Sequence, residues 1–337
     1  MVSLIIPVYN VKPYLRQAIE SVISQSYRNL EILIIDDGSF DGSSIICDEY
    51  AALDSRITVY HKENGGLSSA RNYGLDHMSE HSQYVAFLDS DDWMKEDAIE
   101  SLLNILVKTD ADIACCKYTF QYKTNGSRTA NIAEQDTHVL TKDDILQSFC
   151  SGRNIGNVVW NKLYKKELFS DIRYPEGKAF EDVATTYKIL LKASKVACTS
   201  STLINYRVRE NSISHSYDLE NLQDYWWAHH KQYEDLVAIS ETYGTLVLGS
   251  CMSAIGRMWR WYSGFSKEEK IEGKALLCSM QHFAAEHRKE VMGSSDISKL
   301  QKIWCICAKC KHPIFLRLLY IAGRVYRNVL WKKKLFE

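Results

Sequence analysis

The chain has 337 residues, of which 46% are hydrophobic and 25% are charged, an ordinary globular composition that excludes disordered, collagen-like and coiled-coil rod proteins. This length predicts two domains, or one large domain with an appendage. The formal net charge of −1 argues against a chain that binds nucleic acid. The charge is uneven, because residues 309–337 carry a balance of +7 and residues 1–308 a balance of −8. A basic end on an acidic body predicts a partner for that end.

Nothing in the sequence indicates secretion or a membrane span. Ten cysteines in a chain of this length do not form the pattern of a small disulfide scaffold. The segment Met1–Pro7 has neither a basic region nor a cleavage site, so we expect a cytoplasmic protein with reduced thiols. No run of about 18 apolar residues occurs. The cluster Cys305, Cys307 and Cys310 lacks a separated second ligand pair, which favours ordinary thiols over a zinc site.

The first third of the chain alternates short apolar runs with helical periodicity. The runs that predict strands are Val2–Val8, Leu30–Asp36, Ile57–Tyr60 and Tyr84–Leu88. Residues with the spacing of an amphipathic helix follow each run. This alternation predicts a mostly parallel sheet with helices on both faces, and the carboxyl ends of its strands share one edge. The polar residues expected to meet in one crevice at that edge are Asn10, Asp36, Asp37 and Asp89–Asp92.

The remaining pattern predicts where the first domain ends. The first domain is completed by a further strand at Ala111–Tyr118, strand pieces within Val158–Tyr164 and a helix at Glu181–Lys192. After that the pattern is helical almost throughout and rich in tryptophan. We therefore expect an α/β domain over residues 1–215 and a mainly helical region over residues 216–337.

The strongest chemical pattern is Asp89-Ser90-Asp91-Asp92, which directly follows a predicted strand. Three carboxylates within four residues repel one another unless a cation neutralises them. Capping of the next helix would account for one or two of these acids but not for three. Oxygen ligands favour a hard divalent cation, Mg²⁺ or Mn²⁺, and such ions commonly share their site with substrate phosphates.

A second acidic pair, Asp36-Asp37, precedes Gly38 at the end of another predicted strand. An Asp-Gly pair alone favours a turn. Two acids at the carboxyl end of a buried strand can also accept hydrogen bonds from a nucleobase or a ribose. Asp37 would then hold the base of a nucleoside diphosphate, while Asp91 holds the phosphates through the metal.

Two further patterns are weaker. Gly65-Gly66 permits close backbone approach, and Arg71 lies one turn into the next predicted helix, where it can face a nucleotide. The pair Glu181-Asp182 opens another helix, where acids also interact favourably with the helix dipole. Neither pattern decides a function by itself. The glycine-rich phosphate loops of dinucleotide-binding and P-loop proteins do not occur.

These motifs follow one another along the chain as Ser3-Leu4-Ile5-Ile6-Pro7-Val8-Tyr9-Asn10, Asp-Asp-Gly-Ser, Asn-Gly-Gly with Ala-Arg-Asn, Asp-Ser-Asp-Asp and Glu-Asp. Over residues 2–215 the chain resembles a family 2 glycosyltransferase with the GT-A fold, of the type that builds bacterial capsule, exopolysaccharide and lipopolysaccharide. The resemblance implies a Rossmann-like, mostly parallel sheet with flanking helices. It also implies inverting transfer from a UDP-sugar with Mn²⁺ or Mg²⁺ as cofactor.

The resemblance further implies which residues bind the nucleotide. The implied set is Pro7, Tyr9, Asp37, Arg71, Asp89 and Ser90. The first two would flank the uracil, and the third would bind the uracil edge. Arg71 would lie near the base and the ribose, and Asp89 would contact the ribose.

For catalysis, the resemblance implies that Asp91 ligates the metal and that Asp182 is the general base, with Glu181 beside it. His215 is a further candidate metal ligand. The alternative is the ordinary structural role of a lone histidine. A sugar hydroxyl is a poor nucleophile, so a carboxylate must take its proton while a divalent cation offsets the charge on the departing UDP. The two acid clusters lie about 90 residues apart and can meet only in the predicted fold.

The end of the chain carries a different pattern. From Ile314 onward, apolar residues recur at helical spacing with basic residues between them, and Trp331 is followed by three lysines. A basic amphipathic helix suits the interface of an anionic membrane, where a lipid-linked acceptor would lie. The alternative is a helix that packs on the tryptophan-rich region. We expect a peripheral protein on the inner face of the cell membrane.

The sequence thus predicts a hexosyl- or N-acetylhexosaminyltransferase that uses a UDP-sugar and a glycan or polyprenyl-linked acceptor in surface polysaccharide synthesis. The alternative is a non-catalytic UDP-binding scaffold in a polysaccharide-assembly complex. The intact acid clusters argue against this alternative, since a scaffold needs no general base.

Overall fold

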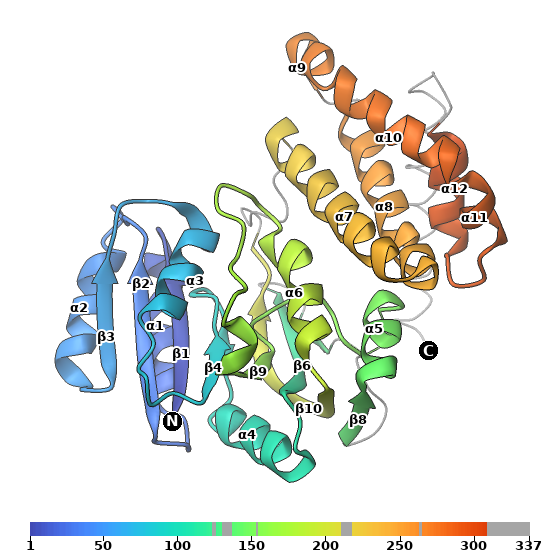
Figure 1. The fold of residues 1–337 in the computed structure, drawn as a ribbon. Coiled ribbons are helices and arrows are strands. Elements are labelled where there is room, and N and C mark those ends of the chain that lie inside the picture. The colour runs from blue at the N-terminus through green and yellow to red at the C-terminus, as the bar shows by residue number, and fades with distance from the viewer. Residues whose placement is uncertain (123–125, 130–136, 153, 210–217, 263–264, 309–337) are drawn as a thin grey trace. The chain divides into compact units, whose positions relative to one another are not determined.

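The computed structural model of the protein describes residues 1–337 except 123–125, 130–136, 153, 210–217, 263–264 and 309–337 (Figure 1). The chain divides into two compact units, Met1–Ser214 and His215–Glu337. Three features expected from the sequence lie outside the described residues, namely His215, Cys310 and the basic segment from Ile314 onward.

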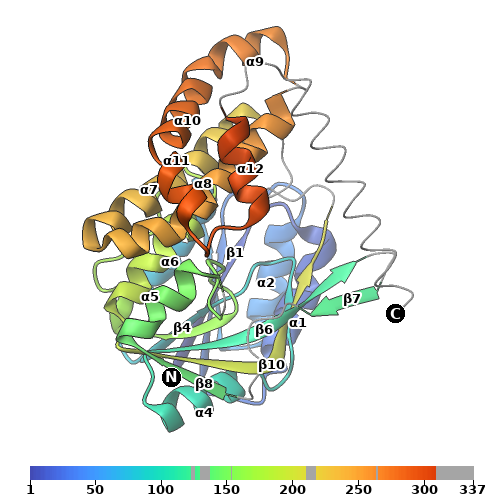
Figure 2. The ribbon, with the colours of Figure 1, turned by 90° about the vertical axis from the view of Figure 1, so that its right-hand side faces the viewer.

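The first unit is built on one sheet with the strand order β3-β2-β1-β4-β9-β6-β10-β5. In addition, β7 pairs with β6, and β8 pairs with β10 (Figure 2). The strands are β1 (Val2–Val8), β2 (Leu30–Asp36), β3 (Ile57–His61), β4 (Tyr84–Phe87), β5 (Trp93–Met94), β6 (Ile113–Tyr122), β7 (Gly126–Thr129), β8 (Thr137–Thr141), β9 (Lys162–Lys165) and β10 (Lys195–Arg207). Strands β1 to β4 run parallel, and β9 lies antiparallel between β4 and β6. The predicted mostly parallel sheet is confirmed.

Helices cover both faces of this sheet, as predicted. They are α1 (Lys12–Ile23), α2 (Ser43–Leu53), α3 (Gly66–Asp76), α4 (Ala98–Thr109), α5 (Lys142–Cys150) and α6 (Glu181–Lys192), with a 3-10 turn at Lys166–Phe169. Leu4 and Ile6 of β1 belong to one buried cluster with Leu15 of α1 and with apolar side chains of α2 and α4. Ile5 points to the opposite face, where it meets α3. Strands buried on both faces read as continuous apolar runs, which is why β1 and β2 were recognisable from the sequence.

Helix α3 approaches β1 closely because Gly74 has no side chain. A methyl group at this position would lie 2.5 Å from Cγ2 of Ile5. The close approach fixes the distance between α3 and β1. It thereby helps to position Arg71, which lies one turn earlier in α3.

We expect Gly74→Ala to lower the free energy of unfolding by about 1–3 kcal/mol, because overpacking outweighs the better helix propensity of alanine. Urea denaturation measures this change. Gly156→Ala is the matched control, since a methyl group there meets nothing within 4 Å. Equal stability of the two variants would contradict the close packing.

In the second unit, the described helices are α7 (Leu219–Ile239), α8 (Glu241–Tyr262), α9 (Lys267–Glu272), α10 (Lys274–Glu286), α11 (Arg288–Gly293) and α12 (Lys299–Cys307). Helices α7 and α8 pack against each other, and α12 packs on α8 (Figure 1). The indole of Trp304 lies over Gly256, where only a hydrogen side chain leaves room. None of the described helices is both long and apolar enough to cross a membrane. Cys305 and Cys307 are buried in α12.

Candidate active site

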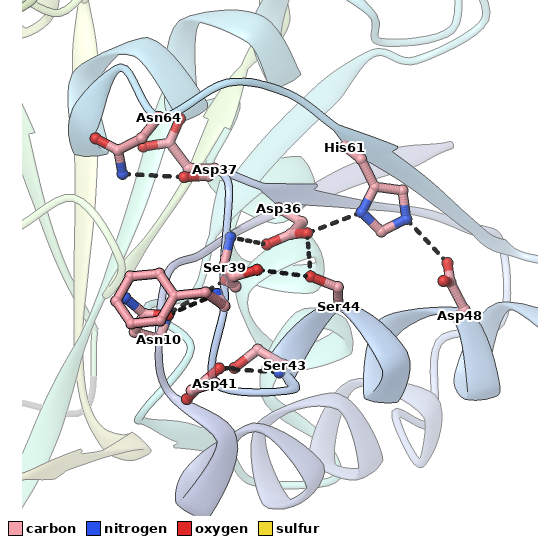
Figure 3. Close-up of polar contacts among 11 residues, drawn as sticks. Asn10, Asp36, Asp37, Ser39, Asp41, Ser43, Ser44, Asp48, His61 and Asn64 are labelled. Atoms are coloured by element: carbon pink, nitrogen blue, oxygen red, sulfur yellow. Dashed lines mark hydrogen bonds and ion pairs between the residues drawn. The ribbon is translucent and has the colours of Figure 1, made fainter.

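The parallel order of β1 and β2 brings the turns that follow them together. The Asp37 N–H donates to the carbonyl of Val8 at 2.9 Å. Asn10 adopts a left-handed backbone with φ of 50°. Its N–H donates to Ser39 Oγ at 3.1 Å, and its side-chain oxygen accepts from the Phe40 N–H at 3.0 Å (Figure 3). The two turns are therefore locked to each other.

Asp36 holds this turn in place and is only 2% exposed. Its carboxylate accepts hydrogen bonds from the Ser39 N–H at 3.1 Å and from Ser44 Oγ at 2.6 Å, and lies 2.8 Å from His61 Nδ1 (Figure 3). Burial opposes ionisation, but these hydrogen bonds outweigh it and lower the pKa of Asp36. The hydrogen bond to Asp36 and the neighbouring Asp48 raise the pKa of His61. Asp36 is therefore a structural acid.

Asp37 organises the glycine loop that opens α3. Its Oδ1 accepts from Lys62 Nζ at 2.6 Å and from the Gly65 N–H at 3.0 Å, and its Oδ2 accepts from the Gly66 N–H at 2.7 Å. Asn64 donates to the Asp37 carbonyl at 3.0 Å (Figure 3). The carboxylate of Asp37, which directly follows β2, thus accepts hydrogen bonds from the N–H groups at the start of α3. This explains why α3 can begin at Gly66, directly after the glycine pair.

Pro7 and Tyr9 differ in how far a ligand can reach them. Pro7 is buried within β1, whereas Tyr9 is 46% exposed. The Tyr9 ring meets the edge of Phe40, which is 81% exposed, with ring centroids 6.2 Å apart. Sequence reasoning did not single out Phe40. The sheet edge therefore presents two exposed aromatic rings, which can stack on a base.

The three carboxylates of the Asp89–Asp92 segment diverge. Asp92 is buried and its Oδ1 accepts from the Arg207 N–H at 2.7 Å. Ser90 is also buried. Asp89 and Asp91 remain partly exposed, with side-chain exposures of 27% and 17%. Burial, followed by repulsion from Asp89, raises the pKa of Asp91.

Asp89 and Asp91 suit a hard divalent cation. Both offer carboxylate oxygens at the strand edge, and a cation would offset the burial and repulsion that raise the pKa of Asp91. Among the described residues, no group of three or more His, Cys, Asp or Glu side chains forms a complete metal cage. That is compatible with Mg²⁺ or Mn²⁺, which are commonly held by one or two carboxylates together with substrate phosphates.

Arg71 joins the two acid clusters that lie far apart in the sequence. Its Nη2 is 2.7 Å from Asp89 Oδ1, and its Nη1 contacts Glu181 Oε1. The guanidinium is 2% exposed and lies 5.5 Å from the ring centroid of Tyr174. Burial opposes its charge, but the two carboxylates outweigh this and raise the pKa of Arg71. Asn72 continues the connection by donating to the Tyr174 carbonyl at 2.9 Å and accepting from its N–H at 2.8 Å.

The Ala-Arg-Asn motif is therefore a clamp between α3, the segment after β4 and the start of α6. The sequence placed Arg71 near a base and ribose. In the structure, its guanidinium is occupied by Asp89 and Glu181. The motif itself was visible in the sequence, but its partners were not.

Helix α6 begins directly after Phe180, which has a left-handed φ of 60°, and Asp182 is the second residue of its first turn. Its Oδ1 accepts from the Val183 N–H at 2.7 Å. Burial, followed by repulsion from Glu181, raises the pKa of Asp182 to about 7, while Arg71 acts in the opposite direction. A carboxyl with this pKa can accept a proton near neutral pH.

The segment Trp160-Asn161-Lys162 has a structural role. Trp160 stacks on Tyr206 with ring centroids 5.4 Å apart. Asn161 donates to the Cys116 carbonyl at 2.8 Å. Lys162 is buried and donates to the Gly156 carbonyl at 3.0 Å, and burial lowers its pKa. These contacts fix the loop that precedes β9.

Comparisons with known proteins find similar sequences. The family model described as Glycosyl transferase family 2 matches residues 3–173. Glycosyltransferase GlyA of Streptococcus pneumoniae serotype 4 is 37% identical over 219 residues, which are 63% of this chain but only 31% of GlyA. Glycosyltransferase GlyG of the same organism is 33% identical over 248 residues, covering 70% of this chain and 81% of GlyG.

Solved structures share the fold. The crystal structure of residues 1–349 of S. aureus TarS in complex with UDP aligns with a TM-score of 0.70 at 18% identity, covering 96% of this chain and 91% of that one. The mannosyltransferase PcManGT from Pyrobaculum calidifontis, in complex with GDP-Man and Mn²⁺, aligns with a TM-score of 0.52 at 16% identity, covering 92% of this chain and 86% of that one. The predicted GT-A fold with a helical C-terminal region is confirmed.

Proposed function

This chain belongs to glycosyl transferase family 2, and from that premise we propose that it transfers a sugar from a UDP-sugar, with inversion, to a glycan or polyprenyl-linked acceptor in surface polysaccharide synthesis. The observation that supports this most is the Arg71 clamp. It ties Asp89, beside the proposed metal ligand Asp91, to Glu181, beside the proposed base Asp182. A single bound nucleotide-sugar could therefore be reached by both the proposed metal ligand and the proposed base.

Asp182 would take the proton of an acceptor hydroxyl while that oxygen attacks the anomeric carbon of the donor. The bond from this carbon to the diphosphate breaks in the same step, and its electron pair leaves with UDP. Attack from the face opposite the leaving group inverts the anomeric configuration. A divalent cation held by Asp91 would supply Lewis-acid stabilisation of the departing diphosphate.

The nucleotide would lie along the edge formed by β1, β2 and β4. Tyr9 is exposed enough to stack on the uracil, with Pro7 forming the floor beneath it. Asp37, already fixed by the glycine loop, would accept a hydrogen bond from the base. Asp89 and Ser90 would face the ribose, and we propose that Arg71 supports this contact by orienting Asp89. In this role Arg71 is a positioning residue.

A donor screen tests the proposal. The full chain is incubated with individual UDP-hexoses and UDP-N-acetylhexosamines and a polyprenyl-linked acceptor, and UDP release is measured with Mn²⁺, with Mg²⁺ and with a chelator. Metal-dependent release from one donor, with an inverted linkage in the product by NMR, is expected. Calorimetric binding of UDP without turnover on any donor would instead support the non-catalytic scaffold.

The reaction should depend on the ionisation of Asp182. We expect kcat/KM to rise with pH through about 7 and then to level off, because the base must be deprotonated and its pKa is raised to about 7. Glu181→Gln removes the negative charge that helps to raise this pKa, so its acidic limb should move to lower pH.

The matched control is Asp143→Asn, which removes an exposed acid from the first turn of α5 and should leave the limb in place. The position of the limb is the readout, because Glu181→Gln also turns the ion pair with Arg71 into a neutral hydrogen bond and should lower the maximal rate. A Glu181→Gln profile with an unmoved limb would contradict the assigned base.

We further propose that the protein associates peripherally with the inner face of an anionic membrane. The support is the excess of basic residues after residue 308 in the sequence. Sedimentation of the full chain with vesicles of anionic lipid, compared with vesicles of neutral lipid, tests this association.

A further inference from the structure

Asp91, the proposed metal ligand, is paired with a side chain that lies just beyond β10. Arg209 Nη2 is 2.6 Å from Asp91 Oδ2. The exposures of the two side chains are 26% for Arg209 and 17% for Asp91, so the pair is largely shielded from water. A positive charge therefore already stands against the carboxylate that a divalent cation would use.

Arg209 is held much less firmly than Arg71, the other arginine of the site. Arg71 is 2% exposed and bridges two carboxylates, so moving it away would leave both of them without a counter-ion. In the part of the chain that the structure describes, Arg209 contacts one carboxylate, and its side chain is 26% exposed. A guanidinium with one carboxylate partner and partial exposure can move at a lower cost.

Arg209 has a second contact that does not involve Asp91. Its guanidinium lies 5.2 Å from the ring centroid of Tyr14, an aromatic face that it shares with Arg207 at 5.0 Å. The neighbouring Arg207 is fixed, because its Nε donates to the Asp91 carbonyl at 2.8 Å and its Nη2 donates to Gln17 at 2.5 Å. Of these two arginines, only Arg209 binds the Asp91 carboxylate itself.

We propose that Arg209 is the counter-ion of Asp91 in the metal-free protein and that a divalent cation binds in exchange for it. The proposal rests on the proposed function in that it takes Asp91 as a metal ligand. The pair neutralises Asp91 next to Asp89 in the metal-free protein. The same pair competes with the cation and weakens its binding in the absence of nucleotide.

The test is Mn²⁺ binding to the full chain without nucleotide, measured by calorimetry and by the loss of the free Mn²⁺ signal in electron paramagnetic resonance. Arg209→Gln should lower the Kd for Mn²⁺ about three- to tenfold, the range expected for removing a competing, partly shielded ion pair. Arg209→Lys keeps a competing charge, so its Kd for Mn²⁺ should lie between those of the natural protein and Arg209→Gln. Arg173→Gln is the control, since it removes the same charge from an exposed pair with Asp76.

The outcomes separate the exchange from the proposed function. If Asp91→Asn abolishes Mn²⁺ binding but Arg209→Gln binds no more tightly than the natural protein, the exchange is wrong while the metal ligand stands. If Asp91→Asn leaves Mn²⁺ binding unchanged, the metal assignment fails, and the exchange fails with it. Absence of Mn²⁺ binding in both the natural protein and Arg209→Gln would also overturn the proposal. Circular dichroism melting confirms that each variant is folded.

Discussion

Replacing Asp182 by asparagine is expected to lower kcat by about 10²–10⁴-fold, the usual contribution of a general base. The amide keeps the size of the carboxylate, and its side-chain oxygen can still accept the hydrogen bond from the Val183 N–H. It cannot take the proton of an acceptor hydroxyl at any pH in the working range. The measurement is steady-state turnover with the donor and acceptor identified in the screen, together with calorimetric UDP affinity.

UDP affinity should change little in Asp182→Asn, because the base is proposed to face the acceptor rather than the nucleotide. The control Asp143→Asn should retain full turnover, since Asp143 is an exposed acid in the first turn of a different helix. Full turnover by Asp182→Asn would remove Asp182 from the mechanism.

Replacing Arg71 by methionine is expected to lower the free energy of unfolding by about 3–5 kcal/mol, because it leaves Asp89 and Glu181 without their shared counter-ion. Arg71→Lys should also impair the site, because one ammonium cannot reproduce the forked contact with two carboxylates. Urea denaturation measures the stability, and UDP binding measures the effect on the site.

Arg16→Met is the control for this loss. Arg16 forms a pair of 2.6 Å with Glu49, but both side chains are about half exposed, at 53% and 48%, so the change should cost far less stability than Arg71→Met. Combining Arg71→Met with Glu181→Gln should recover part of the lost stability, since one unpaired charge is removed. If Arg71→Met were as stable as Arg16→Met, the clamp would not hold the site together.

The sheet could be predicted because its central strands carry the signal themselves. β1 is buried throughout and β2 is buried except at Glu31, and their apolar runs match the structural bounds at Val2–Val8 and Leu30–Asp36. Once these strands are parallel, the position of the acids at one edge follows. The antiparallel strand β9, inserted between β4 and β6, could not be placed this way, because pairing across the sheet leaves no mark on a four-residue segment.

The candidate site was only partly predictable for a related reason. The acids themselves stand out in the sequence, but their roles depend on partners far away in the chain. Asp37 caps a helix that begins 29 residues later, at Gly66. Arg71 finds Glu181 at a separation of 110 residues, and Asp91 meets Arg209 through the end of β10. Such pairs are fixed by the tertiary fold and not by local spacing.

The proposed reaction requires one nucleotide-sugar to bind between Asp91 and Asp182. The most direct test is a crystal structure of the full chain with UDP and Mn²⁺, with the metal located by anomalous scattering. We predict a Mn²⁺ peak about 2.1 Å from a carboxylate oxygen of Asp91. The diphosphate should bind the same ion, and the carboxylate of Asp182 should face the diphosphate from the side where the acceptor would bind. A metal and nucleotide bound away from Asp91, or Asp182 turned away from the nucleotide, would contradict the account.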